Sequence, residues 1–103
     1  MRRLGRAPTT NVLDDLGERA EARRLKERAL AIREEAMGPE HPEVATSLNS
    51  LAMLLDDLGE RTEARRLLER AVAIGEKALE PGHPATQEYA SNLQHILRND
   101  DEG

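Results

Sequence analysis

The sequence contains no cysteine, tryptophan or phenylalanine, and Tyr89 is its single aromatic residue. The absence of cysteine excludes disulfide bonds and thiolate metal sites. No stretch approaches the ~18 consecutive apolar residues of a membrane-spanning helix, and the basic start "MRRLGRAPTT" lacks the apolar run of a signal peptide. We therefore expect no membrane association and a cytoplasmic location.

Excess positive charge is also absent. The formal net charge is −5 at pH 7, whereas a nucleic-acid-binding protein needs a net basic face to displace counterions from phosphates. The basic residues alternate with glutamate and form no block, a pattern typical of a solvated helix surface. We expect no nucleic-acid partner.

Ala, Leu, Arg and Glu dominate what is present, and β-branched residues are few. These are helix-forming residues, so the composition predicts an all-α fold. A chain of 103 residues is long enough for one domain with one core and too short for two.

The chain repeats itself. The stretch "DDLGERAEARRLKERALAI" begins at Asp14, and "DDLGERTEARRLLERAVAI", which differs at three of its 19 positions, begins at Asp56. The offset is 42 residues, and positions 13–42 and 55–84 share 22 identities in 30. Such identity indicates a tandem repeat.

Each repeat is predicted to contain two helices. From Pro42 to Leu58, apolar residues recur every three or four positions and form one stripe. Proline suits the first helical turn, and Gly59 suits the left-handed position after the last turn. A second stripe extends from Glu60 to Leu79, and its counterpart in the first copy contains Ala22, Leu25, Ala29, Ile32 and Ala36. A third segment, Pro84 to Arg98, repeats the first helix of the unit.

A two-helix unit cannot bury its stripe alone, so neighbouring units must stack into a solenoid. Leu48-x-x-Leu51-Ala52-x-x-Leu55 followed by Ala64-x-x-x-Leu68 resembles the tetratricopeptide repeat. The 42-residue period with "PEHPEVATSLNSLA" is similar to the kinesin light chain type. The resemblance implies a right-handed α-solenoid of antiparallel A and B helices, about two and a half repeats, with a concave groove lined by A helices that binds a protein or peptide.

The sequence departs from this family in two ways. Residues with aromatic counterparts in the family are here Leu55, Thr62 and Leu68, so aromatic anchors are missing. The first A helix is degenerate, because Arg6, Thr9 and Thr10 stand where the second copy has Leu48, Leu51 and Ala52, and Pro8 falls mid-helix. We expect a frayed segment at 1–10, a short helical piece ending at Leu16, a repeat domain at 11–99 and an acidic tail at 100–103.

The resemblance implies which side chains face the groove. Asparagine can bind a peptide backbone, methionine supplies adaptable apolar contact, and the paired aspartates can attract a basic partner, although Arg61 or Arg65 could neutralise them. The alternative is that these residues only keep the surface hydrated. The expected groove residues are Thr46, Asn49, Met53, Asp56, Asp57, Glu88, Ser91, His95 and Arg98.

His41 and His83 each precede a proline in the inter-repeat turn, which predicts a structural role in place of metal binding or catalysis. No metalloprotease, nucleotide-binding or acid–base motif occurs, so we expect neither an enzyme nor a cofactor. Gly75 lies inside a helix and could allow a close approach, but we favour simple tolerance at ~1 kcal/mol relative to alanine.

The leading hypothesis is thus a scaffold or adaptor module that binds a partner protein. A second hypothesis is self-association through the ends of the array, in which the first B helix (Leu25, Leu30) pairs with the last A helix (Leu93, Ile96, Leu97) of another copy.

Overall fold

The computed structural model describes residues 3–102, with side chains described for residues 15–99. The described residues form four helices and no strand: α1 (Arg3–Met37), α2 (Pro42–Asp57), α3 (Arg61–Ala78) and α4 (Pro84–Glu102). The predicted all-α class is confirmed.

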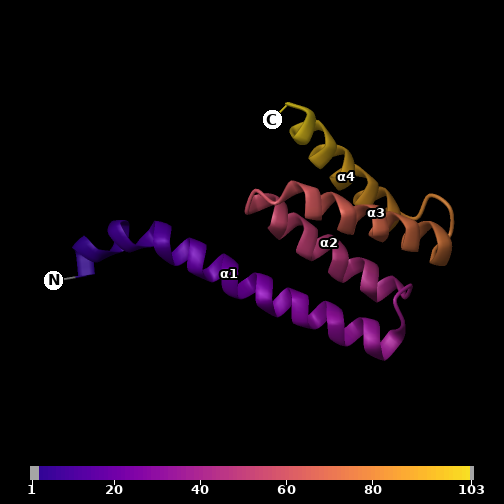
Figure 1. Ribbon diagram of the computed structural model, residues 1–103, viewed down its shortest axis with the longest axis horizontal. Coiled ribbons are helices and arrows are strands. Elements are labelled where there is room, and N and C mark those ends of the chain that lie inside the picture. Colours follow the sequence, from indigo (N-terminus) through magenta and orange to yellow (C-terminus); the bar gives the residue numbers. More distant parts are fainter. Residues whose placement is uncertain (1–2, 103) are drawn as a thin grey trace.

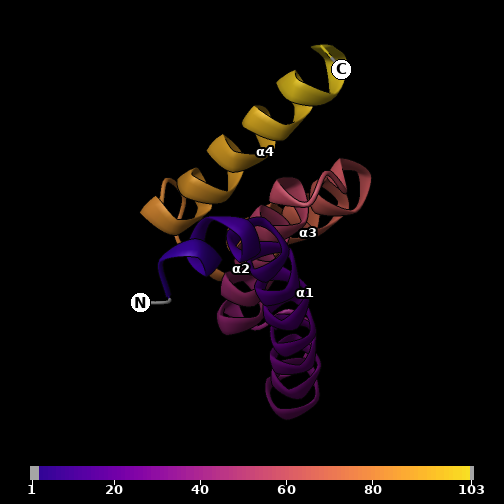
Figure 2. The ribbon, with the colours of Figure 1, turned by 90° about the vertical axis from the view of Figure 1, so that its left-hand side faces the viewer.

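The helices stack in chain order. α2 packs against α3 as a hairpin, α1 packs against α2, α4 packs against α3, and α2 also contacts α4. α1 and α4 lie on opposite sides of the α2–α3 pair, as two perpendicular views show (Figures 1 and 2). The amino-terminal half of α1 extends beyond the other three helices (Figure 1). This is the architecture of a helical repeat array, with α2 and α4 in A positions and α3 and the second half of α1 in B positions.

The hydrophobic core lies between α2, α3 and α4. Val44, Leu48, Leu55, Leu68 and Ile96 have no more than 2% of their surface exposed. Alanines on the same stripes are also buried, and their small side chains let the helix axes approach closely. Each fully buried large apolar side chain stabilises the fold by about 1.5–3 kcal/mol.

The helix boundaries in the second repeat follow the predicted signals. The Nδ1 atom of His41 accepts a hydrogen bond from the Glu43 amide at 3.0 Å, and His83 does the same for Ala85 at 3.0 Å. Both histidines therefore act at helix starts, before the prolines that open α2 and α4. Gly59 has a φ of 85°, the left-handed conformation that ends α2 and turns the chain into α3.

The first repeat differs from the prediction. α1 is one helix of 35 residues that contains Pro8 and Gly17, so the predicted helix end at Leu16 is wrong. The hexapeptide "DDLGER" is helical at 14–19, but at 56–61 it contains the end of α2, the turn and the start of α3. α2 turns back because its apolar stripe packs on α3. A fold-back in the first copy would bury Arg6, Thr9 and Thr10, which offers no comparable hydrophobic gain.

The carboxyl-terminal residues also differ locally, because α4 continues to Glu102 instead of ending near Arg98. Met1, Arg2 and Gly103 lie outside the described residues. The division into a terminal segment at 1–10, a repeat domain at 11–99 and a tail at 100–103 stays a prediction.

Gly75 corrects a second expectation. A Cβ atom at this position would lie 2.4 Å from the Thr86 Oγ1 atom and 3.1 Å from its Cβ atom. The glycine is therefore not merely tolerated, because α4 approaches α3 so closely at this point that an added Cβ atom would force the Thr86 side chain to shift.

Candidate functional site

The two A-position helices are joined by hydrogen bonds between uncharged side chains. The hydroxyl groups of Thr46 and Tyr89 lie 3.3 Å apart, and the Asn92 Nδ2 atom donates to the Asn49 Oδ1 atom at 2.9 Å. Both pairs link α2 to α4, so they fix the spacing of the row of A helices. Asn49 was expected to bind a ligand backbone, and its carbonyl oxygen already accepts the bond from Asn92.

The two adjacent aspartates differ in their surroundings. The Asp56 side chain is 11% exposed, with Arg61 Nε 3.4 Å from one carboxylate oxygen and His95 Nε2 3.8 Å from the other. Asp57 is exposed. Asp56 is therefore held within the fold at the end of α2, and Asp57 remains open to an incoming cation.

Two hollows meet on one face of the array. One, of about 230 Å³, lies between α1 and α2 and is lined by Lys26, Ala29, Arg33, Thr46, Ser47 and Ser50. The other, of about 360 Å³, is lined by Arg33, Pro42, Glu43, Thr46, Leu79, His83, Ala85 and Tyr89. Arg33 and Thr46 line both, so the two hollows are neighbours: the first lies between α1 and α2, and the second lies between α2 and the start of α4.

The nine expected groove residues are distributed unevenly around these two hollows. Thr46 lines both of them. Met53 is half-buried and packs against the core, which limits its use as a free contact. Five others are exposed side chains on α2 and α4 that do not line either hollow: Asp57, Glu88, Ser91, His95 and Arg98.

Sequence reasoning missed the contribution of α1. Lys26 Nζ donates to Ser50 Oγ at 2.6 Å, and Arg33 Nη1 donates to Ser47 Oγ at 2.6 Å. The signal was present in the repeat alignment, because the counterparts 42 residues later are Leu68 and Gly75. The first copy therefore has two cationic side chains where the second copy has a leucine and a glycine, so the α1–α2 contact differs from the α3–α4 contact.

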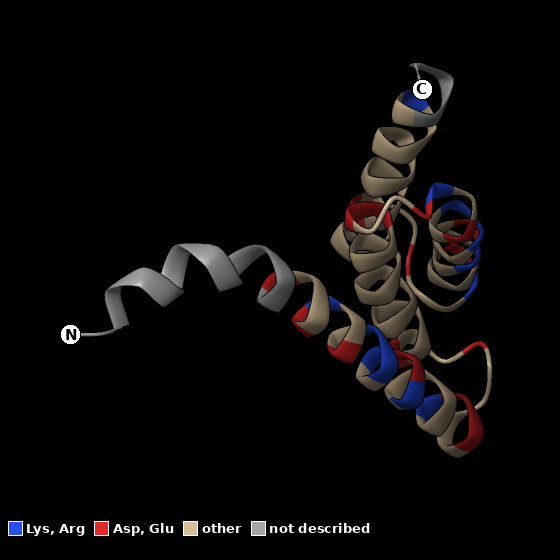
Figure 3. Ribbon diagram, turned by 60° about the vertical axis from the view of Figure 1, so that its left-hand side comes forward, with Lys and Arg blue, Asp and Glu red and all other residues tan. Residues whose placement is uncertain are grey.

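Charge separates the two kinds of helix. α2 carries only Glu43, Asp56 and Asp57, whereas α3 and the described side chains of α1 carry many charges of both signs (Figure 3). α2 and α4, which carry few charges, are the two A helices joined by the hydrogen bonds between uncharged side chains. This contrast marks the row of A helices as the face that differs chemically from the rest of the surface.

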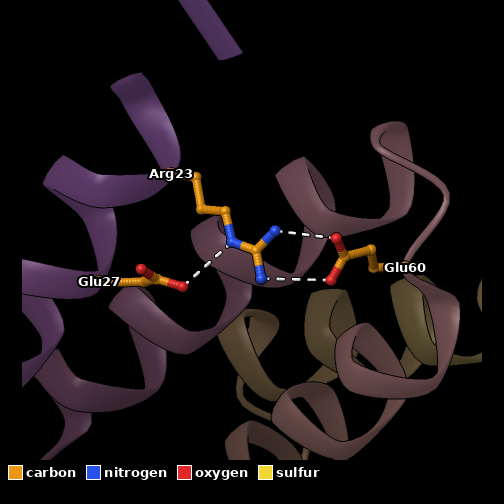
Figure 4. A network of polar contacts seen from close by, with 3 residues as sticks. All are labelled: Arg23, Glu27 and Glu60. Atoms are coloured by element: carbon orange, nitrogen blue, oxygen red, sulfur yellow. Dashed lines mark hydrogen bonds and ion pairs between the residues drawn. The ribbon is translucent and has the colours of Figure 1, made fainter. Parts of the chain in front are cut away.

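The B-position helices are joined instead by ion pairs. Arg23 of α1 binds Glu60 through two hydrogen bonds of 2.9 and 3.2 Å and binds Glu27 at 3.1 Å (Figure 4). The carboxylate of Glu60, followed by that of Glu27, raises the pKa of the Arg23 guanidinium above its usual value. Ion pairs of Arg70 with Glu34 and Lys77 with Glu40 add further links to α3.

The expected self-association surface is corrected in part. Ile96 has 0% of its surface exposed, and Leu30 and Leu93 are partly buried against the core. Leu97 is half-buried, and of the five expected residues Leu25 alone is exposed, at 57%.

Within the described residues, no three His, Asp or Glu side chains lie close enough together to hold a metal ion. None of the described helices has a stretch both long and apolar enough to cross a membrane.

These features define a class of protein: an all-helical repeat array that presents a hollowed row of A helices. A profile of the tetratricopeptide repeat family matches residues 11–77, and the chain belongs to this family. Tetratricopeptide repeats generally mediate protein–protein interactions, and this is the coarse function of the chain. A search of curated proteins found no match.

Proposed function

We propose that the chain is a scaffold or adaptor module that holds a peptide or helix of a partner protein on the α2–α4 face. The observation that carries this proposal is the hollow of about 360 Å³ that α2 and α4 line together through Thr46, Ala85 and Tyr89. The exposed groove residues on the rim supply hydrogen-bonding groups and charge. The proposal is of a binding protein and not an enzyme.

The same proposal includes a basic partner, a cytoplasmic location and the kinesin light chain-like repeat type. The 42-residue period and the "PEHPEVATSLNSLA" stretch support the repeat type. Asp57 and Glu88 are exposed on neighbouring A helices and support a preference for lysine or arginine in the ligand.

The test is a selection of linear peptides from a displayed library on the immobilised chain, followed by affinity measurements on two variants. Ser91→Arg places a bulky cation on the α2–α4 face, and Ala73→Arg places the same group on the exposed side of α3. We expect Ser91→Arg to weaken binding about ten-fold, a loss of about 1.4 kcal/mol, and Ala73→Arg to leave it unchanged. Peptides that bind both variants as tightly as the parent chain would contradict the proposal.

Self-association through the repeat ends is an alternative function that one observation favours. Leu25 and Ile32 are each 57% exposed on α1, more than expected for large apolar residues on a covered stripe. Light scattering over a hundred-fold range of concentration separates the two functions, because only self-association predicts a mass that rises with concentration and falls back in Leu25→Asp.

A further inference from the structure

The apolar stripe of α1 is uncovered along its length. Leu25 and Ile32 are each 57% exposed, whereas Ile74, the counterpart of Ile32, is 3% exposed. Ala29 is exposed and its counterpart Ala71 is buried. The stripes are nearly identical in sequence, so the difference lies in the cover: the α3 stripe packs against α2 and α4, and α1 packs only against α2. α1 and α3 are equivalent helices of the two repeats, so the helix that would cover the α1 stripe is one in the A position, as α2 is for α3.

Two cations border this stripe. Lys26 and Arg33 lie two turns apart on α1, about 10.5 Å along the helix axis. Among the described residues, Lys26 has no carboxylate within 4.0 Å, and the nearest to Arg33 is Glu43 at 4.0 Å. Together with Leu25, Ala29, Ile32 and the serines of α2, they form what we term the α1–α2 groove. An apolar floor with two positive charges along one edge fits an amphipathic helix with a negative edge.

The chain's own amino-terminal segment does not have that chemistry. The 42-residue offset places Arg2, Arg3 and Arg6 at the positions of Val44, Ala45 and Leu48, which are fully buried in α2. A fold-back at Gly17 would bring three arginines toward a groove that already carries Lys26 and Arg33, so both burial and like charge oppose it.

A second copy of the chain is also a poor match. Among the described residues, the exposed large hydrophobic side chains, Leu16, Leu25, Ile32 and Met37, all lie on α1. An α4 helix from another copy therefore presents no large exposed apolar residue to the stripe. Pairing of two α1 stripes would bring the cationic edges of both copies together, which is unfavourable.

We propose that the α1–α2 groove binds an amphipathic helix of a partner protein, in the position that α2 occupies against α3. The apolar stripe of that helix covers Leu25, Ala29 and Ile32, and its carboxylates pair with Lys26 and Arg33. This second surface lies beside the hollow between α2 and α4, with which it shares Arg33 and Thr46 as lining residues, and it accepts the opposite charge. The module would thus hold an acidic helix on one surface and a basic peptide on the other.

The probe is a synthetic peptide of residues 42–58, the A helix that covers the equivalent stripe in the structure. A crosslink between positions 50 and 54 holds it helical, and fluorescence anisotropy measures its affinity for the full chain. The acidic form carries Thr46→Glu and Met53→Glu, on the side that faces the next A helix in the structure, so that its carboxylates match the seven-residue spacing of Lys26 and Arg33. The neutral form carries Thr46→Gln and Met53→Gln.

We expect the acidic peptide to bind at least about ten-fold more tightly than the neutral one. The double variant Lys26→Glu/Arg33→Glu should remove this preference, and Leu25→Asp should weaken both peptides. The matched control Arg65→Glu/Arg66→Glu reverses two exposed arginines of α3 and should retain the preference. Circular dichroism confirms that each variant keeps its helical content.

Equal affinity for the two peptides, or binding unaffected by Leu25→Asp, would overturn the proposal. A chain whose mass rises with concentration until Leu25→Asp abolishes the rise would assign the groove to a second copy and would also overturn it. Neither outcome depends on Ser91, so failure here is distinguishable from failure of the α2–α4 proposal.

Discussion

At the scale of single residues, the two helical glycines have opposite roles. A Cβ atom at Gly17 would meet nothing within 4 Å, whereas one at Gly75 would collide with Thr86. Both glycines carry the intrinsic helix penalty of about 1 kcal/mol. Packing around each glycine therefore decides whether a substitution to alanine raises or lowers the free energy of unfolding.

We predict that Gly75→Ala lowers the free energy of unfolding by about 1–3 kcal/mol, the usual cost of overpacking a core. Gly17→Ala is the matched control and should raise it by up to about 1 kcal/mol. Urea unfolding followed by circular dichroism measures both. The double variant Gly75→Ala/Thr86→Ala removes the Oγ1 and Cγ2 atoms of residue 86, including the atom at 2.4 Å, and should recover most of the loss. A Gly75→Ala variant as stable as the parent would show that α4 does not approach α3 this closely.

The histidines at the helix starts give a second prediction at this scale. His41→Ala removes the acceptor of the Glu43 amide and should cost about 1 kcal/mol, as for other N-cap residues. His41→Asn supplies another acceptor at the same position and should retain most of the stability. If the two variants unfold at the same urea concentration, the imidazole does not act as a cap.

At the scale of elements, the hexapeptide "DDLGER" shows where sequence reasoning succeeds and fails. The ends of α2 and the start of α3 could be predicted, because proline, glycine and the apolar stripe all agree there. The same six residues at 14–19 gave the wrong prediction, since a turn needs a return helix that can pack. Local signals fix a helix end only when the tertiary contact supports it.

This explanation predicts that the first turn can be restored. Replacing Arg2, Arg3, Arg6, Thr9 and Thr10 with Val, Ala, Leu, Leu and Ala gives the first segment the apolar positions of α2. The chain should then turn at Gly17, and the free energy of unfolding should rise by several kcal/mol as Leu25 and Ile32 become buried. Spin labels at positions 5 and 29 should move closer together, and an unchanged distance would mean that the straight helix does not depend on those residues.

The candidate site was predictable to a similar extent. The repeat alignment placed Thr46, Asn49 and Ser91 on the row of A helices, because helical periodicity fixes which side a residue occupies. It did not show that Asn49 is bonded to Asn92, that Asp56 is enclosed by Arg61 and His95, or that Lys26 and Arg33 border a groove. Those facts depend on the packing of separate helices, which periodicity within one helix does not determine.

At the scale of the whole molecule, the apolar stripes of α1 and α3 are nearly identical in sequence but are buried by neighbouring helices to different extents. The stripe of α3 is enclosed by neighbours on both sides, and that of α1 is open to a partner. On our proposal, packing among α2, α3 and α4 stabilises the array and the α1 stripe binds a partner, since each repeat supplies the same interface. The central claim is therefore an asymmetry between equivalent residues.

Thiol labelling measures that asymmetry most directly, because the chain has no native cysteine. Ile32→Cys and Ile74→Cys place one thiol at equivalent positions of the two copies, and their rates of reaction with a thiol reagent can be compared under native conditions. We predict that Ile32→Cys reacts at nearly the rate of an unfolded control and that Ile74→Cys reacts at least about a hundred-fold more slowly, because local or global opening must precede its reaction. Equal rates at the two positions would contradict the account.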